Sequence, residues 1–331
     1  MSHLHDPGFA QRLKWRHRIG SVFTWACGLS TWLSLLFLAV LLGAVLWKSA
    51  GWLTWDFLWR FDSGTPEKAG IVAGLLGSLW LIGLTALFCV PVGVGAAIYL
   101  EEYARSNWFT RLIQLNISNL AGVPSIVYGI LGFTAFVRMF GLPKETYDVS
   151  LGFAAVRLTV PFGRTVIAGA LTLTLLSLPV VIIASQEALR AVPASLRHAS
   201  YALGATKWQT ISRQVLPASL PGILTGVILA LSRALGETAP LAVLGAALYI
   251  TFAPGRIARW SDLISRPGGV LQAPFDNFTA LPLQIYHWVN EANPKFQNVA
   301  AAGIVVLLIV LVLLNGTAIY IRQRFQRSLR W

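Results

Sequence analysis

Residues 299–321 read VAAAGIVVLLIVLVLLNGTAIYI, a run of 23 residues without a charged side chain. A helix of roughly 20 apolar residues can cross the hydrocarbon core of a bilayer, because its backbone hydrogen bonds are satisfied internally. Working back along the chain, we find five more such stretches, at 28–47, 71–100, 112–140, 165–185 and 220–252. We therefore expect an all-α, polytopic membrane protein of about six transmembrane helices.

The composition supports a membrane location. Only 12% of the 331 residues are charged, 56% are hydrophobic and the mean hydropathy is +0.65, whereas a soluble domain carries about 25% charged residues. Tryptophan favours membrane interfaces, and six of the 13 tryptophans bracket the first apolar stretch: Trp25, Trp32, Trp47, Trp52, Trp55 and Trp59. A soluble globular protein is therefore excluded, and lipid is an expected partner.

Basic residues predict the orientation. One predicted side carries four groups of them, which are Arg12, Lys14, Arg16 and Arg18; Arg105 and Arg111; Arg190, Arg197, Lys207 and Arg213; and Arg322, Arg324, Arg327 and Arg330. Because positive loops remain in the cytoplasm, both termini are expected there. The apolar run at 22–47 is too long for a cleaved signal peptide, so it predicts a retained first helix. The net charge of +13 comes without any nucleic-acid-binding motif, so no nucleic acid partner is expected.

Prolines and closely spaced glycines predict where these helices bend and pack. Pro91, Pro124 and Pro179 lie within apolar stretches and should kink or unwind their helices. Two pairs of glycines, Gly129 with Gly132 and Gly222 with Gly226, have the short spacing that lets helix backbones approach closely in lipid. The loop at 253–298 is the longest predicted segment outside the membrane, and its Pro and Gly residues favour turns and a short surface helix.

The segment between the fourth and fifth stretches is amphipathic. Apolar residues recur there at helical spacing on both sides of Gly204, which predicts two short helices broken at that glycine. Such a hairpin could lie in the lipid interface, pack beneath its own helix bundle, or dock a partner protein.

Two ionisable residues lie well inside the fifth stretch, Arg233 and Glu237. A charge at the bilayer centre costs about 2.5–3.5 kcal/mol on insertion scales, so such residues usually face the bundle interior and pair. Their spacing places both on one helix face, where they can form an ion pair. The pair could merely fasten helices together. Alternatively, Arg233 could offer its planar fork to a tetrahedral oxyanion, held by Glu237, with the backbone opening at Gly236 and Pro240.

Three further arginines are weaker candidates. Arg138 lies near the outer end of the third stretch, where it could line the same pathway or extend to the interface. Arg157 and Arg164 flank Pro161 before the fourth stretch, where they could dock an acidic binding protein or serve as ordinary surface charges.

Four motifs resemble a known family. Gly204 followed by Leu216 and Pro217 resembles the "EAA" loop of ABC-importer permeases, with Ala199 also matching, although His198 replaces the family's Glu and Gln214 its Ile. The runs AGVPSIVYG at 121–129, EALRAVP at 187–193 and RALGETAP at 233–240 resemble phosphate-importer permeases, and the last resembles the PstA-type subunit.

The resemblance implies a fold, a mechanism and partners. It implies the type I (MetI-like) permease fold. Residues 1–24 would form the cytoplasmic N-terminal segment, 25–70 the first helix and outer loop, 71–323 the permease domain and 324–331 the cytoplasmic tail. A coupling loop at about 186–218 would contact a dimeric PstB-type ATPase, which alone would bind ATP and Mg. A PstC-type permease and a PstS-type phosphate-binding protein would complete the importer, and this chain would bind no cofactor. The implied coupling residues are Ala199, Gly204, Ala205, Thr206, Lys207, Trp208, Leu216 and Pro217, and the implied packing or kink residues are Pro124, Gly129, Gly236 and Pro240.

Several alternatives remain open. The chain could occupy the PstC-type position, or carry sulfate or molybdate, since these anions are also tetrahedral. It could also be an ion-coupled carrier that uses Glu237, although few other acids lie within the apolar stretches. An enzyme is not expected, because the sequence has no phosphate-binding G-x-x-x-x-G-K-[ST] run, no His/Cys metal spacing and no nucleophile–base set.

Overall fold

The computed structural model describes residues 7–143, 145–150, 155–247, 250, 252, 254–255 and 267–327. Its α-helices are α1 (Pro7–Ser49), α2 (Val72–Ile98), α3 (Trp108–Leu120), α4 (Ser125–Gly132), α5 (Val166–Arg190), α6 (Ala194–Ala202), α7 (Lys207–Thr210), α8 (Leu216–Gly236), α9 (Ala239–Leu244), α11 (Pro267–Gln272), α12 (Leu281–Val289) and α13 (Phe296–Arg327). Short 3₁₀ turns cover Asp56–Leu58, Pro66–Lys68, Met139–Gly141 and Ala273–Phe275, and π-helical turns cover Tyr99–Tyr103, Phe133–Val137 and Ile211–Val215. The helical prediction is confirmed, with one addition: strands β1 (Glu145–Ser150) and β2 (Ala155–Val160) form an antiparallel hairpin.

Five helical segments within the described residues are long and apolar enough to span a membrane, and a bent pair brings the number to six. They are Lys14–Ser49, Val72–Tyr103, Val166–Arg190, Lys207–Gly236 and Phe296–Arg324, with Trp108–Leu120 and Ser125–Val137 as the bent pair. The predicted number of about six is therefore confirmed when the bent pair is counted as one span.

The third predicted stretch, 112–140, is not one continuous helix. α3 and α4 meet at an angle of 106°, because Pro124 stands immediately before α4 with extended backbone angles. A proline restrains the preceding residue from the helical conformation, so the chain turns here. α4 then packs against α9, and the ideal Cβ position of Gly129 lies only 2.8 Å from the Pro240 Cα.

The fifth predicted stretch, 220–252, is also interrupted. α8 ends at Gly236, and Glu237 has extended backbone angles (φ −78°, ψ 115°) before the chain resumes as α9. Gly236 has a low helix propensity, and Pro240 lies in the first turn of α9, where a missing backbone N–H costs little. The break leaves a short segment of non-helical backbone beside Arg233.

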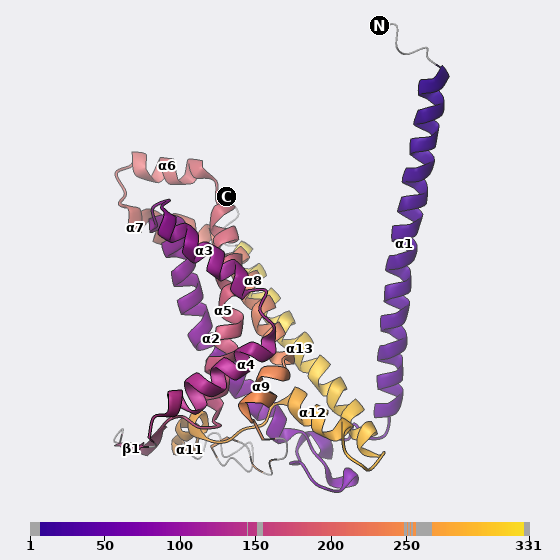
Figure 1. The fold of residues 1–331 in the computed structure, drawn as a ribbon, viewed down its shortest axis with the longest axis vertical. Helices are drawn as coiled ribbons and strands as arrows, with labels where there is room; N and C mark the ends of the chain where they lie inside the picture. Colours follow the sequence, from indigo (N-terminus) through magenta and orange to yellow (C-terminus); the bar gives the residue numbers. More distant parts are fainter. Residues whose placement is uncertain are drawn as a thin grey trace.

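The centre of the bundle is formed by α2, α5 and α8 (Figure 1). α5 and α8 approach closely because small residues face each other: the ideal Cβ of Gly222 lies 2.7 Å from the Ala188 Cβ, and that of Gly226 lies 2.3 Å from the Ala184 Cβ. The predicted close packing at Gly222 and Gly226 is confirmed, and it is the packing expected where van der Waals contact replaces hydrophobic burial.

The short helix predicted in the outer loop has a counterpart in α11, which begins at Pro267, but the loop also contains α12, which was not predicted and packs into the core. Leu281, Leu283 and Trp288 are almost completely buried. The Gln284 amide accepts from the Gly74 N–H and donates to the Gly70 carbonyl, which fixes α12 against the start of α2.

A second contact fastens α12 to the loop after α1. The Trp288 Nε1–H donates to the buried Asp62 carboxylate at 2.9 Å. Burial raises the pKa of Asp62 above its ordinary value, and the hydrogen bonds from Trp288 and Ser63 oppose this shift. The apolar period of α12 was obscured in the sequence by the prolines and glycines around it.

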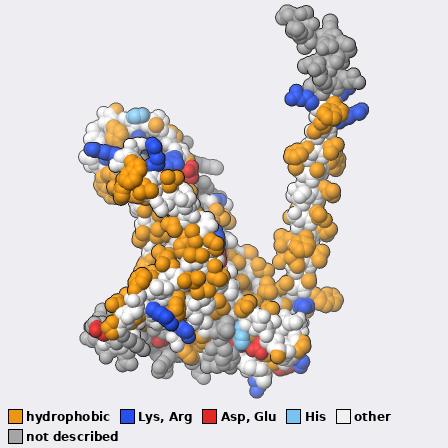
Figure 2. Space-filling model, in the orientation of Figure 1, with side chains coloured by type: hydrophobic (Ala, Val, Ile, Leu, Met, Phe, Trp, Pro, Cys, Tyr) orange, Lys and Arg blue, Asp and Glu red, His pale blue; other side chains and the backbone are white. Residues whose placement is uncertain are grey.

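α1 stands apart from the bundle over most of its length, and α13 is its main neighbour (Figure 1). The start of α1, the end of α13 and the α6–α7 hairpin lie at the same end of the molecule. Lys and Arg side chains gather on this end, whereas hydrophobic side chains cover most of the middle (Figure 2). This distribution is the one expected for a protein whose middle faces lipid.

Gly77→Ala is expected to destabilise the protein by about 1–3 kcal/mol, because the added Cβ overpacks a contact. Its ideal position lies 2.0 Å from the Thr279 carbonyl oxygen, which belongs to backbone and cannot move aside easily. Thermal unfolding of the purified protein in detergent would measure the loss. The matched control is Gly83→Ala on the same helix, where no atom lies within 4 Å. An equal melting temperature for both variants would contradict the close packing at Gly77.

Candidate functional site: the α6–α7 hairpin and the α8–α9 break

The predicted amphipathic hairpin is confirmed. α6 ends at Ala202, and Gly204 then adopts a left-handed conformation (φ +81°) that reverses the chain. Thr206 caps α7 by accepting from the Gln209 N–H, and the Gln209 side chain accepts from the Thr206 N–H in return. Gly204 is the natural residue for this turn because a Cβ disfavours positive φ. The sequence thus sets a fixed angle between two short helices.

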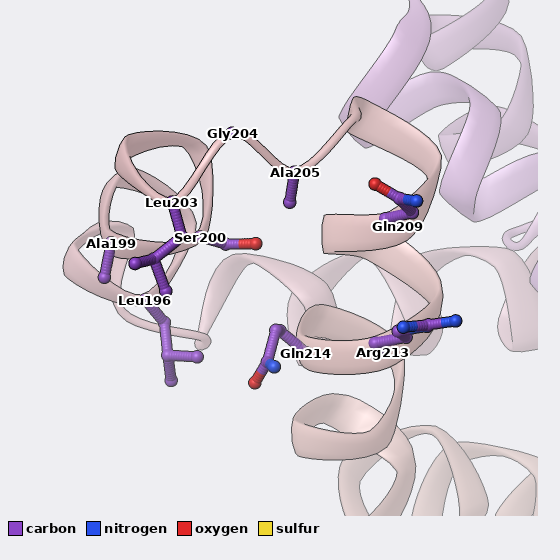
Figure 3. A pocket seen from close by; sticks show the side chains of 9 residues that line it. All are labelled: Leu196, Ala199, Ser200, Leu203, Gly204, Ala205, Gln209, Arg213 and Gln214. Carbon is purple, nitrogen blue, oxygen red and sulfur yellow. The ribbon is translucent and has the colours of Figure 1, made fainter.

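A cavity of about 480 Å³ lies between the two arms of the hairpin. Figure 3 shows Leu196, Ala199 and Leu203 on the α6 side and Gln209, Arg213 and Gln214 on the opposite side. Leu203 is 89% exposed and Trp208 is 62% exposed, so two large apolar side chains point away from the chain's own core. Leu203 also joins Leu196 and Ala199 in the lining of the hollow, where polar side chains such as Gln209 and Arg213 stand beside them. An exposed apolar patch rimmed by polar residues is a feature of protein docking surfaces.

The predicted coupling residues divide into two groups. Ala199, Gly204 and Ala205 line the cavity, and Trp208 is exposed beside it. The remaining members are not among the residues that line the cavity: Thr206 caps α7, the Lys207 ammonium lies 5.1 Å from the centre of the Tyr103 ring, and Leu216 and Pro217 begin α8.

An ion pair that the sequence reasoning missed anchors the hairpin. The Arg197 guanidinium donates to Glu102 at 2.8 Å and to the carbonyls of Leu189 and Val192 at the end of α5. Both charged side chains are largely buried, with exposed fractions of 19% and 8%. Arg197 therefore joins α6 to the ends of α2 and α5. A signal for this pairing was the adjacent Glu101 and Glu102 on the predicted basic side.

The Arg233–Glu237 pair lies at the α8–α9 break. The Arg233 Nε donates to the Glu237 Oε1 at 3.3 Å, so the predicted ion pair forms, although Glu237 lies just beyond the helix and not within it. Leu229, Arg233 and Gly236 form an exposed stripe on α8, and the Arg233 side chain is 55% exposed. The opposite face of α8 carries buried residues such as Val227 and Ala234.

The other predicted arginines do not join this pair. Arg138 follows the π-helical turn after α4, and its guanidinium lies 4.8 Å from the centre of the Phe133 ring. Arg164 is exposed immediately before α5. The Arg157 side chain lies outside the described residues.

Residues 89–330 match the family "binding-protein-dependent transport system inner membrane component". The chain belongs to this family. It is 35% identical over 260 residues to the "phosphate transport system permease protein PstA 1" of Mycobacterium tuberculosis (strain CDC 1551 / Oshkosh), covering 78% of this chain and 72% of that protein. It is 28% identical over 305 residues to the "phosphate transport system permease protein PstC" of Pasteurella multocida (strain Pm70), covering 87% of this chain and 88% of that protein.

Among solved structures, a chain of the bacterial alginate ABC transporter, in complex with a periplasmic protein bound to alginate pentasaccharide, superimposes with a TM-score of 0.60. The identity is 18%, and the match covers 93% of this chain and 98% of that one, so the likeness shows the fold alone. The fold is that of a type I ABC importer permease. The chain is thus a multi-pass membrane permease.

Proposed function

We propose that this permease forms one half of the membrane channel of an ABC importer for inorganic phosphate. The observation that carries this function is Arg233, a half-exposed guanidinium in the last turn of the span Lys207–Gly236, just before the α8–α9 break, with only its Nε used by Glu237. Both Nη atoms remain available within the described structure, and a guanidinium fork suits phosphate oxygens. The substrate assignment also draws on the relative named as a PstA phosphate permease.

The exposed stripe of α8 would face a second, PstC-type permease. A pair that merely fastened helices of this chain would be buried between them, whereas Arg233 points away from the helices that α8 packs against. Two permeases that place such stripes opposite each other would enclose a path lined by arginine and unwound backbone. Non-helical backbone at membrane depth is tolerated where it lines a cavity.

The α6–α7 hairpin would couple this path to a PstB-type ATPase dimer. Both termini and the hairpin would be cytoplasmic, as the Lys and Arg residues at this end favour. ATP and Mg would bind only to the ATPase, and this chain would bind no cofactor. Movement of the hairpin, transmitted through Arg197 and Glu102 to α2 and α5, would switch the permease pair between inward-open and outward-open states. A PstS-type protein outside would supply phosphate.

The PstC-type position is the second candidate, because the chain is also similar to a PstC permease. The higher identity to the PstA relative favours the first.

Labelled phosphate uptake tests the proposal. A strain that lacks only this chain should lose high-affinity uptake during phosphate starvation, and the gene should restore it. Sulfate and molybdate should not compete, and an ATPase should co-purify with the chain. A deficit in sulfate or molybdate uptake, with phosphate uptake normal, would show that the importer carries another oxyanion instead of phosphate. Absence of a co-purifying ATPase would favour an ion-coupled carrier.

A further inference from the structure

A second pocket lies at the opposite end of the molecule from the hairpin, beside the end of α9. Its volume is about 500 Å³, and it is lined by Arg164, Asn277 and Tyr286 together with Ala242, Gly245, Ala246 and Ala247. Three polar side chains from three separate segments therefore meet at a floor of small residues.

The backbone builds this pocket around Arg164. Thr165 and Asn277 pair in an isolated antiparallel bridge, which brings the segment before α5 next to the segment before α12. Gly245 ends α9 in a left-handed conformation (φ +84°), and its ideal Cβ position lies 2.7 Å from the Arg164 Nε. Any larger residue at 245 would therefore meet the Arg164 side chain. Gly245 gives Arg164 the space to lie against α9.

The polar groups of the pocket have no other use within the described structure. Arg164, Asn277 and the Tyr286 hydroxyl make no side-chain hydrogen bond or ion pair there, and none of the described residues that line the pocket is acidic. The neighbouring Asp276 instead accepts from the Gly255 N–H at 2.8 Å. A guanidinium, an amide and a phenol together offer several N–H and O–H donors, which suits an anion with several oxygens.

Only the short helix α9 separates the pocket from the Arg233–Glu237 pair along the chain. α9 has six residues and so spans about 9 Å at 1.5 Å per residue, with the Arg233–Glu237 pair before its first residue and Gly245 after its last. An anion that entered at Arg164 would need to pass only this short helix to reach Arg233.

We propose that Arg164, Asn277 and Tyr286 form an outer receiving site for a tetrahedral oxyanion, phosphate above all. The site would bind the anion before the anion reaches Arg233. The inference therefore rests on the proposed function and adds a second binding site to the path of the anion. The rival role for Arg164 is an ion pair with an acidic surface of the external binding protein.

A cysteine-protection experiment on the complete, purified importer tests for the site directly. Ala247→Cys places a thiol in the pocket without removing its polar groups, in a background with exposed Cys27 replaced by Ser and buried Cys89 retained. A neutral maleimide labels this thiol with and without inorganic phosphate, against chloride at equal ionic strength. With phosphate at about three times its Kd, labelling should slow about fourfold, because the free fraction falls as 1/(1 + [L]/Kd).

Arg164→Gln in the same background should remove this protection, and Arg164→Lys should retain part of it, because lysine keeps the charge but loses the fork. The control is Gly64→Cys in the exposed loop before α2, where no atom lies within 4 Å of the ideal Cβ position, and its labelling should not respond to phosphate. Equal slowing by chloride, equal slowing at the control, or protection unchanged in Arg164→Gln would each overturn the proposal.

Transport then separates the anion site from the rival. Arg164→Gln should lower phosphate uptake at saturating binding protein, while the binding-protein concentration that half-stimulates ATP hydrolysis stays unchanged. An increase in that concentration, with protection by phosphate intact, would assign Arg164 to protein docking instead. If the unmodified importer moved no phosphate, the proposed function would fail, whereas the labelling result would still decide whether the pocket binds the anion.

Discussion

Arg233→Gln is expected to reduce phosphate uptake by about 10- to 100-fold while the importer assembles in normal amounts. Glutamine keeps part of the side-chain volume but removes the charge and the fork, and a hydrogen bond to a charged group contributes about 1.5–3 kcal/mol. The loss should fall on transport, because the 55% exposed guanidinium makes few contacts with its own helix bundle. Uptake of labelled phosphate, together with immunodetection of the chain in membranes, would measure both quantities.

The matched control is Arg60→Gln. Arg60 forms a similar ion pair with a carboxylate four residues away, Asp56, and it is 49% exposed, but it lies in the loop before α2. Loss of that pair should leave uptake unchanged. If Arg233→Gln instead removed the chain from the membrane, the pair would be a structural fastening, and the anion pathway would have to be sought elsewhere.

The transmembrane architecture could be predicted because it depends on local composition. An uncharged run such as 299–321 has few alternatives to a membrane helix, and α13 indeed spans Phe296–Arg327. The two interrupted spans were harder to predict, since a proline shows where a helix can break but not how far the helix bends. The 106° angle between α3 and α4 depends on where α4 can pack, which here is against α9 and α5.

The candidate sites divide in the same way. The hairpin turn at Gly204 and the Arg233–Glu237 pair each involve residues that are close together along the chain, so each pattern was visible in the sequence. The Arg197–Glu102 contact joins residues 95 positions apart, and the outer pocket combines side chains from positions 164, 277 and 286. Such sites arise only when distant segments pack together, and no local spacing encodes them.

Gly204→Pro is expected to uncouple ATP hydrolysis from phosphate uptake, with uptake falling at least as far as for Arg233→Gln. Proline fixes φ near −65°, whereas the turn needs +81°. It also removes the N–H that donates to the Tyr201 carbonyl at 2.9 Å. The angle between α6 and α7 would change, so movement of the ATPase would no longer be transmitted correctly. Phosphate transported per ATP hydrolysed, measured in vesicles, reports this coupling.

Two milder substitutions show whether conformation is the cause. No atom lies within 4 Å of the ideal Cβ of Gly204, so a side chain here meets no obstacle and only the positive φ is unfavourable. Asn adopts this conformation more readily than Ala, which loses roughly 1–2 kcal/mol in it. Coupling should therefore decrease in the order Gly, Asn, Ala, Pro. An equal defect in Asn and Pro would mean that the surface beside Gly204 must be bare for docking, and wild-type coupling in Pro would remove the hairpin from the mechanism.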